Sequence, residues 1–541
     1  MKNKVVALAK QLKYVWLLEP PELALSWQPK WFVETLESVL NQTVPLWELT
    51  IVVPAQHAPT VRKALVGYWK VSSKPKEQIS IVTRTGVHPE KILRALMRNS
   101  ELDWVAVITG YDRLALDATY TLLNASLRGQ TPNVVYGDHD YFSRKPQSSL
   151  ACIKPPFCED LLCSQNYIGN FFAIRRAALF VHGEPSKDLE LAWAHDLLLR
   201  ISEGTSSVVL PIFHVHGVLY HCRQRRPSAS TQQKQLNQSM QVVRNHFLRK
   251  RLVVKTKLHR RGLIKNEWPL PVPAPKVSLI IPTRDGHNIL KACVTSILDR
   301  MHYKNFEILI IDNQSQDPKT LRYLAQIVKK EQRVKVLPFN EPFNYSAINN
   351  FAVKQCTGEI IGFINNDVEA LNRGWLTEMV SHAVRPNVGA VGALLFYPDM
   401  TVQHGGVLVG MHGVADHAFK GADPKSAKDD PFGMLQSTRS AEAVTAAVML
   451  MRKEIFNTVG GFDDKHLKIA FNDVDLCLRL RLRDLRVIYT PHAQLIHHES
   501  KSRKRDVSAQ SRQTELYEHA IMRSRWGTDR IHPQQHPSRY I

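Results

Sequence analysis

Residues 359–369 read EIIGFINNDVE. The first six residues are mostly apolar and are typical of a buried β-strand. The strand then runs into Asn365, Asn366 and Asp367, with Glu369 two residues further on. A carboxylate at the end of a buried strand is costly to desolvate unless it meets a partner. This stretch therefore predicts a polar site where the strand ends.

The same strand belongs to a regular alternation of strands and helices. The pattern predicts strands at the apolar, β-branched runs 277–282, 306–312, 334–339 and 359–364. The segments between them have helical periodicity, at 289–301, 321–330 and 344–356. This alternation predicts an α/β fold with a mostly parallel, Rossmann-like sheet covered on both faces. Because such sheets bind ligands at the carboxyl ends of their strands, we expect Asp312 and Asp367 to face the same crevice.

Two further polar sites follow. Asp473 and Asp475 lie in FNDVDLCLRLR (471–481), at a predicted helix start, and HHES (497–500) follows the strand-like run at 486–496. An aspartate in any one of these places is often only a turn or capping residue. Several polar sites that each follow or precede an apolar run favour a shared functional site. A helix N-terminus also stabilises a carboxylate at Asp473.

Six motifs between residues 277 and 500 together resemble the GT-A glycosyltransferases of family 2. They are VSLIIPTRD, FEILIIDNQSQD, FNYSAINNFAVKQCTGEIIGFINNDVE, VGGFDD, FNDVDLCLRLR and IHHES. The resemblance implies a GT-A fold. It also implies an inverting transferase that takes a sugar from a nucleoside diphosphate.

The resemblance assigns roles to individual residues. Asp473 matches the family's catalytic base. Asp367 matches the last acid of its metal motif, and His497 or His498 matches a later histidine that can complete the metal site. The resemblance also implies that Asp312 reaches the nucleobase of the donor. Donor-binding positions are expected at Pro282, Thr283, Asp285, Asp312, Ser315, Asn349 and Asn366. Candidate acceptor or loop positions are His404, Gly461, Asp463 and Asp475.

A divalent cation, Mg²⁺ or Mn²⁺, is the expected cofactor, because it would neutralise the charge on the leaving diphosphate. Such ions keep several waters, so one or two protein carboxylates suffice. One departure from the family pattern affects this site. Two residues before Asp367, where the family usually has an acid, stands Asn365, whose amide oxygen is a weaker ligand.

A glycine- and histidine-rich stretch, VQHGGVLVGMHGVADHAFKG (402–421), lies between the metal motif and the predicted base. Glycine permits mobility and close backbone approach, so one interpretation of this stretch is a loop that closes over the donor. In that interpretation His404, His412 and His417 touch phosphate or acceptor. The alternative is a loop whose histidines have no role.

The first half of the chain looks like a degenerate copy of the second. Residues 37–57, 103–123 and 192–204 can be laid over 295–315, 359–379 and 470–482. Val53 then stands at the position of Asp312, Tyr111 at that of Asp367, with Asp112 adjacent, and Ala194 at that of Asp473. A repeat of this length indicates two whole domains. Aliphatic residues at these positions predict a non-catalytic first domain, which packs on the second or holds acceptor glycan.

The sequence therefore predicts three parts. Residues 1–265 form the degenerate GT-A-like domain, and the proline-rich stretch 266–276 is a stiff extended linker. Residues 277–541 form the catalytic domain with a basic C-terminal extension.

Composition and charge limit the partners and the cellular location that are expected. The 541 residues carry a net charge of +22, which favours anionic partners, but no nucleic-acid-binding motif is present. The seven scattered cysteines form no CxxC pair, which fits a reducing cytoplasm. No run is long and apolar enough for a transmembrane helix, and the N-terminus reads as ordinary chain rather than a signal peptide. Basic clusters at 246–261 and 501–506 predict peripheral contact with the inner face of the cytoplasmic membrane.

The predicted function is a hexosyl- or deoxyhexosyltransferase that extends a surface polysaccharide or lipid-linked glycan. Two alternatives stay open. One is a non-catalytic carbohydrate-binding or scaffold protein of a glycan-assembly complex. The other is a nucleotidyltransferase that makes the donor, for which a basic, glycine-rich loop after the first strand is expected; PTRDGHN (282–288) has one glycine and one arginine.

Overall fold

The computed structural model shows two compact units, which meet in sequence at residues 252–259. Within the described part of the chain, no helix is both long and apolar enough to cross a bilayer. The structure describes residues 14–19, 29–44, 47–55, 58–69, 79–84, 103–126, 132–142, 150–182, 189–204, 212–223, 228–426, 428–498 and 509–530. The basic cluster at 501–506 lies outside these residues.

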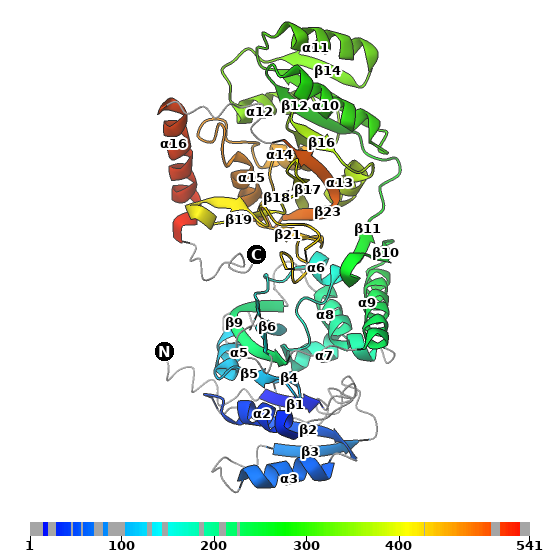
Figure 1. The fold of residues 1–541 in the computed structure, drawn as a ribbon, viewed down its shortest axis with the longest axis vertical. Coiled ribbons are helices and arrows are strands. Elements are labelled where there is room, and N and C mark those ends of the chain that lie inside the picture. The colour runs from blue at the N-terminus through cyan, green and yellow to red at the C-terminus, as the bar shows by residue number, and fades with distance from the viewer. Residues whose placement is uncertain are drawn as a thin grey trace. The chain divides into compact units, whose positions relative to one another are not determined.

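The second unit is built on a sheet whose strand order is β14–β13–β12–β15–β22–β17–β23–β16 (Figure 1). Strands β12, β13, β14 and β15 run parallel, as the alternating sequence pattern predicts, and β22 is antiparallel to β15. The α/β prediction is therefore confirmed. The strands are β12 (Val277–Thr283), β13 (Phe306–Asp312), β14 (Val334–Pro338), β15 (Ile360–Ile364), β16 (Val368–Ala370), β17 (Val388–Phe396), β18 (Val402–His404), β21 (Arg439–Ala441), β22 (Val448–Arg452) and β23 (Arg486–His497).

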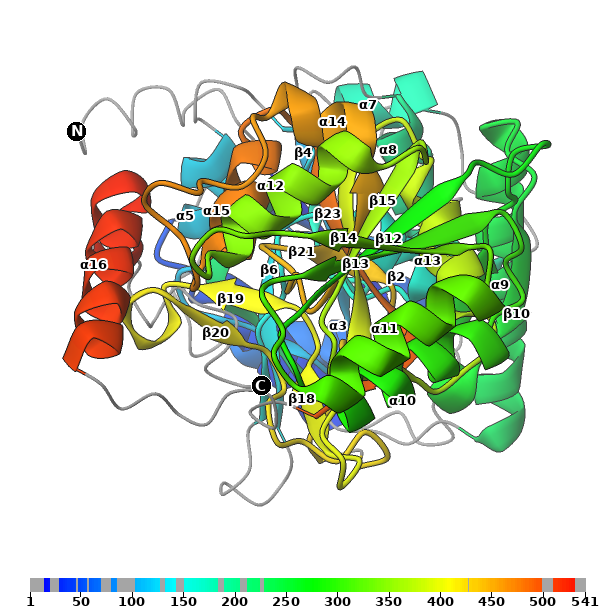
Figure 2. The ribbon, with the colours of Figure 1, turned by 90° about the horizontal axis from the view of Figure 1, so that it is seen from above.

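Helices cover both faces of this sheet (Figure 2). On β12, Leu279 and Ile281 point to one face and Ile280 to the other, as the two-residue period of a strand requires. One face packs against α10 (His287–Asp299), α11 (Pro318–Lys330) and α13 (Trp375–Ala383). The other packs against α12 (Tyr345–Gln355), α14 (Lys453–Thr458) and α15 (Asn472–Arg481). The helices thus bury both apolar faces of the sheet, and the polar side chains lie at the ends of its strands.

The proline-rich stretch is extended, but it is not a free linker. Tyr303 Oη donates a hydrogen bond to the Pro275 carbonyl at 2.5 Å, and Asn305 Nδ2 donates to the Ala274 carbonyl at 2.9 Å. The Arg385 guanidinium lies 4.1 Å from the centre of the Trp268 ring. These contacts place residues 268–275 within the second unit, so the division between the units falls earlier than the expected linker at 266–276.

The first unit repeats the strand order of the second. Its sheet runs β3–β2–β1–β4–β8–β6–β9–β5, which matches the second sheet position by position. The strands are β1 (Tyr14–Glu19), β2 (Trp47–Pro54), β3 (Ile79–Arg84), β4 (Trp104–Thr109), β5 (Arg113–Leu114), β6 (Val134–Phe142), β7 (Leu150–Cys152), β8 (Ala173–Arg175) and β9 (Ile212–Arg223). The helices are α2 (Pro29–Leu40), α3 (Ala58–Trp69), α5 (Ala118–Ser126), α6 (Glu159–Ser164), α7 (Arg176–His182), α8 (Trp193–Glu203) and α9 (Ala229–Arg249). The internal duplication inferred from sequence is therefore visible in the topology.

Side chains repeat as well. In α8, Arg200 Nε donates to Asp196 Oδ2 at 2.9 Å, and in α15, Arg479 Nε donates to Asp475 Oδ2 at 2.8 Å. This shared pair puts Ala194 at the position of Asp473. An aliphatic side chain there cannot accept a proton.

The alignment of Tyr111 with Asp367 needs correction by one residue. Asp112 directly precedes β5, as Asp367 directly precedes β16, and β4 has six residues where β15 has five. The first unit therefore keeps an acid at this place. Its carboxylate is buried and accepts hydrogen bonds from the Arg223 N–H and Tyr220 Oη, both at 2.7 Å. Internal donors thus occupy the carboxylate.

Candidate active site

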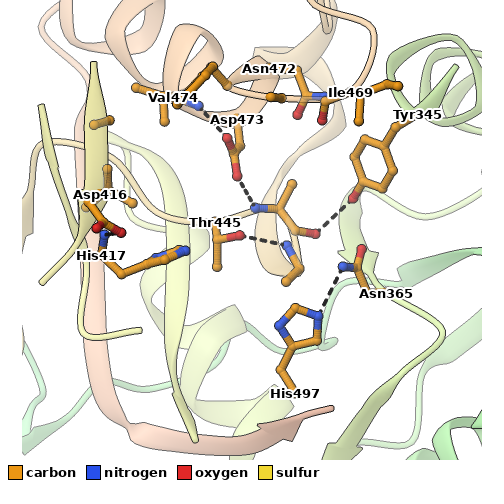
Figure 3. Close-up of a pocket in the computed structure, with 16 residues that line it drawn as sticks. Tyr345, Asn365, Asp416, His417, Thr445, Ile469, Asn472, Asp473, Val474 and His497 are labelled. Atoms are coloured by element: carbon orange, nitrogen blue, oxygen red, sulfur yellow. Dashed lines mark hydrogen bonds between the residues drawn. The ribbon is translucent and has the colours of Figure 1, made fainter. Parts of the chain in front are cut away.

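A cavity of about 340 Å³ opens in the second unit beside the N-terminus of α15. Its walls come from residues 469–474, from residues 445–447 and from a hairpin of β19 (Val407–Val409) and β20 (Ala415–His417). Asn365 and His497 complete it. Figure 3 shows Asp473 and His497 on opposite sides of the cavity, with Thr445 between them.

Asp473 lies in the first turn of α15 and is partly exposed to this cavity. Its Oδ2 accepts a hydrogen bond from the Ala446 N–H at 3.0 Å, and its Oδ1 accepts one from the Val474 N–H at 2.8 Å. Two backbone donors and the positive end of the helix stabilise the ionised carboxylate. The side chain predicted to be the base is therefore anchored by backbone donors and lines the cavity.

His497 faces Asp473 from the end of β23. Its Nδ1 lies 2.8 Å from Gln403 Oε1, an acceptor, so we assign the ring proton to Nδ1. Its Nε2 then carries a lone pair and lies 3.2 Å from Asp367 Oδ1 and 3.3 Å from Asn365 Nδ2. An unprotonated nitrogen and a carboxylate oxygen at this separation repel unless a proton or a cation lies between them.

This pair fits the expected divalent cation on chemical grounds. It offers one carboxylate and one imidazole, and within the described residues no cluster of three histidine, cysteine or acidic side chains could hold a metal by itself. Mg²⁺ and Mn²⁺ take the remaining ligands from water and substrate phosphates in such sites. Asp367 and His497 therefore suit a metal shared with a diphosphate better than a permanent structural metal.

His498 lies outside this arrangement. Neighbouring residues of a strand point to opposite faces, and His498 Nε2 lies 2.7 Å from Glu369 Oε1 instead of reaching the cavity. The sequence left His497 and His498 as alternatives. The structure places the His497 ring beside the Asp367 carboxylate, whereas the His498 N–H donates to the Asp367 backbone carbonyl at 2.9 Å.

The expected donor-binding residues continue the site along the strand ends. Thr283 and Asp312 are register partners at the carboxyl ends of β12 and β13. Asn366 Nδ2 donates to Thr283 Oγ1 at 3.0 Å, and Asn366 precedes Asp367 in the chain. The strand ends thus form a continuous polar edge from Asp312 to the cavity.

Other expected donor residues have structural partners. The Asp285 N–H donates to Ser315 Oγ at 2.8 Å, and Asp285 Oδ1 accepts the N–H groups of Gln316 and Asp317 at 2.7 Å each. Asp285 and Ser315 therefore shape the loop after β13 that borders Asp312. Pro282 lies within β12, one residue before Thr283.

Asn349 is buried inside α12, where its Nδ2 donates to the Tyr345 carbonyl at 2.8 Å. It does not line the cavity. The neighbouring Asn350 has the clearer role in the site, because its Oδ1 accepts the Phe462 N–H at 3.0 Å and its Nδ2 donates to Asp464 Oδ2 at 3.0 Å. Asn350 thereby holds the VGGFDD loop.

Asp475 and Asp463 also lie away from the cavity. Asp475 is fully buried, and its Oδ1 accepts from Arg525 Nη1 at 2.7 Å and Trp526 Nε1 at 3.0 Å, both on α16 (Ala509–Trp526). Arg525 Nη2 donates to Asp463 Oδ2 at 2.7 Å. The carbonyl of Gly461, which has a φ of 69°, accepts from Arg479. Asp463 and Asp475, two of the expected acceptor positions, therefore dock the C-terminal helix, and Gly461 is hydrogen-bonded to α15.

The ion pair with Arg525 predicts a pH-dependent stability. Burial alone would raise the pKa of Asp463, but hydrogen bonds from Arg525 and His466 lower it from 3.8 to about 2. The stabilisation is then present above pH 4 and is lost as the pH falls toward 2. We expect Asp463→Asn to cost about 1–2 kcal/mol at pH 7. Thermal unfolding of the variant and wild type from pH 7 to 3 should show this difference shrinking below pH 4; a constant difference would contradict the prediction.

His404 is fully buried and does not line the cavity, but it contacts a residue that does. Its Nδ1 lies 2.7 Å from Nδ1 of His417 on β20. Burial, followed by the nearby charges of His417, Arg439 and His497, lowers the pKa of His404 well below 6.5. His404 is therefore a neutral support for the hairpin.

Several cavity residues escaped sequence reasoning. Asp416 reaches the cavity because the glycine-rich stretch folds as a hairpin, and His417, which the sequence did name as a candidate, reaches it for the same reason. Gly410 and Gly413, with φ values of 92° and 85°, allow its turn. Tyr345 lines the cavity from α12 and donates to the Ala446 carbonyl at 3.0 Å. The continuous apolar run Val407–Val409, followed by Gly410 and Gly413, was the available signal for the hairpin.

Comparison with known proteins relates this chain to glycosyltransferases. The model of "Glycosyl transferase family 2" matches residues 278–459. The O-antigen biosynthesis protein RfbC of Myxococcus xanthus is 34% identical over 478 residues, covering 87% of this chain and 36% of RfbC. An uncharacterised protein, y4gI, of Sinorhizobium fredii is 34% identical over 521 residues, covering 94% of this chain and 56% of y4gI. This chain thus spans about a third to a half of the length of these two relatives.

A third relative matches the second unit more narrowly. The N-acetylglucosaminyl-diphospho-decaprenol L-rhamnosyltransferase of Mycobacterium tuberculosis is 27% identical over 218 residues, covering 37% of this chain and 68% of that enzyme. The motifs, the parallel sheet and the family match agree with one another. Residues 278–459 of the second unit are therefore a glycosyl transferase family 2 domain.

Proposed function

We propose that this chain is an inverting glycosyltransferase that moves a sugar from a nucleoside diphosphate sugar to a growing surface polysaccharide or lipid-linked glycan. One observation carries the proposal. Asp473 faces a cavity whose opposite side holds His497 beside Asp367, and the polar edge of the sheet leads from there to Asp312.

Each part of this arrangement has a chemical task. The Asp473 carboxylate accepts the proton of the acceptor hydroxyl as that oxygen attacks the anomeric carbon. Attack from the face opposite the diphosphate inverts this carbon, and one base suffices without a covalent intermediate. Asp367 and His497 would hold a divalent cation, Mg²⁺ or Mn²⁺, which when bound supplies Lewis-acid neutralisation of the diphosphate charge. Thr283 and Asp312 would hold the nucleoside.

The substrate class is drawn from the relatives. One is an O-antigen biosynthesis protein and another an L-rhamnosyltransferase that acts on a decaprenol-linked sugar diphosphate. We propose a hexose or deoxyhexose as the donor sugar and a glycan carried on lipid as the acceptor.

The first unit is proposed to be non-catalytic. Val53 lies at the place of Asp312, Ala194 at that of Asp473, and the Asp112 carboxylate is occupied by internal donors. None of these groups can repeat the chemistry of the second unit, so the first copy would serve packing or acceptor binding.

A donor panel tests the proposal. The full chain is incubated with UDP-, GDP- and dTDP-sugars and Mn²⁺, and hydrolysis and thermal protection are measured. One nucleotide sugar should be hydrolysed slowly, with water as the acceptor, and should raise the unfolding temperature. If no nucleotide sugar is hydrolysed or protects, the catalytic proposal fails and a scaffold function is favoured.

We further propose a cytoplasmic protein that binds the inner membrane surface reversibly. All seven cysteines are free. The cluster at 246–261 combines basic residues with exposed apolar ones, including Leu248 and Val253, whose exposed fractions are 71% and 84%. Anionic lipid contributes about 1 kcal/mol for each basic residue near the surface.

Vesicle sedimentation checks this location. The protein should pellet with anionic vesicles at low salt and be released at high salt, because salt screens these charges. Neutral vesicles are the control. Absence of binding at low salt would favour a soluble acceptor, and salt-resistant binding would point to an apolar anchor instead.

A further inference from the structure

Helix α16 supplies a buried carboxylate to the wall of the cavity. Glu518 is 1% exposed, its Oε1 accepts the Ile469 N–H at 2.9 Å, and its Oε2 accepts the Ala470 N–H at 2.8 Å. Ile469 and Ala470 both line the cavity. Both oxygens of one carboxylate thus hold consecutive backbone donors just before α15.

The backbone that follows is strained. Phe471 has a φ of 57°, a left-handed conformation that non-glycine residues rarely adopt. Such a residue persists only where its surroundings hold it. Two contacts hold Phe471 in place. Glu518 accepts the N–H groups of the two preceding residues, and the Phe471 ring packs edge-on against the His519 ring, with 4.8 Å between the ring centres. Asp473 follows two residues later.

The same helix reaches the opposite wall. Thr528 Oγ1, just after α16, donates to the Gly413 carbonyl at 3.0 Å, and Gly413 lies at the turn of the β19–β20 hairpin. Figure 1 and Figure 2 both show α16 beside this hairpin. Two walls of the cavity are therefore attached to α16 or to the residues that directly follow it.

We propose that Glu518 is a positioning residue for transfer: it holds the strained segment at Phe471 and so orients the Asp473 carboxylate toward the acceptor. This inference rests on the proposed function of Asp473. Glu518 touches neither substrate nor the reacting atoms. Its carboxylate matters because two N–H groups need two acceptor oxygens, and glutamine would oppose one of them with its own N–H₂.

Glu518→Gln separates positioning from folding. The helix keeps its bonds from Arg525 and Trp526 to Asp475, so the variant should stay docked. Glu515→Gln is the matched control, because Glu515 lies on the same helix with a side chain that is 68% exposed, and its carboxylate lies 4.0 Å from His519 Nε2 at the outer limit of an ion pair. We expect the hydrolysis kcat for the donor found in the panel to fall about tenfold or more in Glu518→Gln, with its KM within about twofold, since small misplacements of a reacting group cost rate.

A double-mutant cycle with Asp473→Asn decides the mechanism. If Glu518 acts through Asp473, Glu518→Gln should cost nothing further in the Asp473→Asn background, whereas an independent structural role would give additive losses. Hydrogen exchange of the 466–474 segment in the full chain should rise in Glu518→Gln. Should that variant fail to fold, Glu518→Asp is used for the same measurements.

The outcomes are distinguishable. A kcat for Glu518→Gln equal to that of Glu515→Gln, unchanged exchange at 466–474, or additive losses in the cycle would each overturn the positioning role. Full activity of Asp473→Asn would instead overturn the proposed base, whatever Glu518→Gln shows.

Discussion

Replacing Asp473 by asparagine is expected to lower turnover by about 10²-fold or more while leaving donor affinity nearly unchanged. The amide keeps the size of the side chain, although its NH₂ replaces one of the two oxygens that accept the Ala446 and Val474 N–H groups. The bonds from Arg525 and Trp526 to Asp475 still hold α15, so the cavity should persist. It cannot accept the proton of the attacking hydroxyl. The donor is expected at Asp312, Thr283 and Asp367, along the strand ends that lead to His497 and away from α15, so its binding should not depend on this charge.

The measurement is hydrolysis of the nucleotide sugar identified in the panel, with calorimetry of the corresponding nucleoside diphosphate for affinity. Asp484→Asn is the control. Asp484 lies just past the other end of the same helix, is exposed and has a φ of 57°, a conformation that asparagine tolerates. Turnover of Asp473→Asn within about twofold of this control would defeat the assignment of the base.

The second large effect is expected at Asp367. Asp367→Ala removes the carboxylate that lies beside His497 Nε2. It should abolish stimulation by Mn²⁺ and weaken donor binding by about tenfold or more, because a bound cation contributes several kcal/mol of charge stabilisation to the diphosphate. His497→Ala should act in the same direction but less strongly, because a carboxylate is the better ligand for hard cations.

His498→Ala provides the matched control. His498 is the next residue along, pairs with Glu369 and does not line the cavity, so its removal should leave the Mn²⁺ dependence unchanged. Activity is measured across a Mn²⁺ titration after treatment with a chelator. Activity that survives the chelator would rule out the cation role and leave basic side chains to neutralise the diphosphate.

Local sequence patterns were sufficient to predict the main strands and helices of the second unit. The change between two-residue and 3.6-residue periodicity placed β12, β13, β15 and the helices between them, and strand ends at Asp312 and Asp367 followed directly. The start of α15 beside Asp473 was equally readable. These features depend on neighbouring residues in the chain, so sequence contains them.

The duplication was readable in part. Similar motifs at similar spacings predicted two copies, and the repeated strand order agrees. The position of Asp112 was not readable, because a single extra residue before β5 shifts the alignment without altering the local pattern. Only the pairing of β5 with β9 fixes which residue precedes the strand.

The sequence by itself therefore determined the fold class, the order of the polar sites and the identity of the candidate base. The tertiary structure alone decided that His497 rather than His498 meets Asp367, that Asp475 and Asp463 dock α16, and that Glu518 reaches residues 469–470. The physical reason is common to all three. Which side chains meet depends on strand register and helix docking between segments far apart in the chain, 49 residues in the case of Glu518 and Ile469. The periodicity of one segment does not identify the distant segment that it will contact.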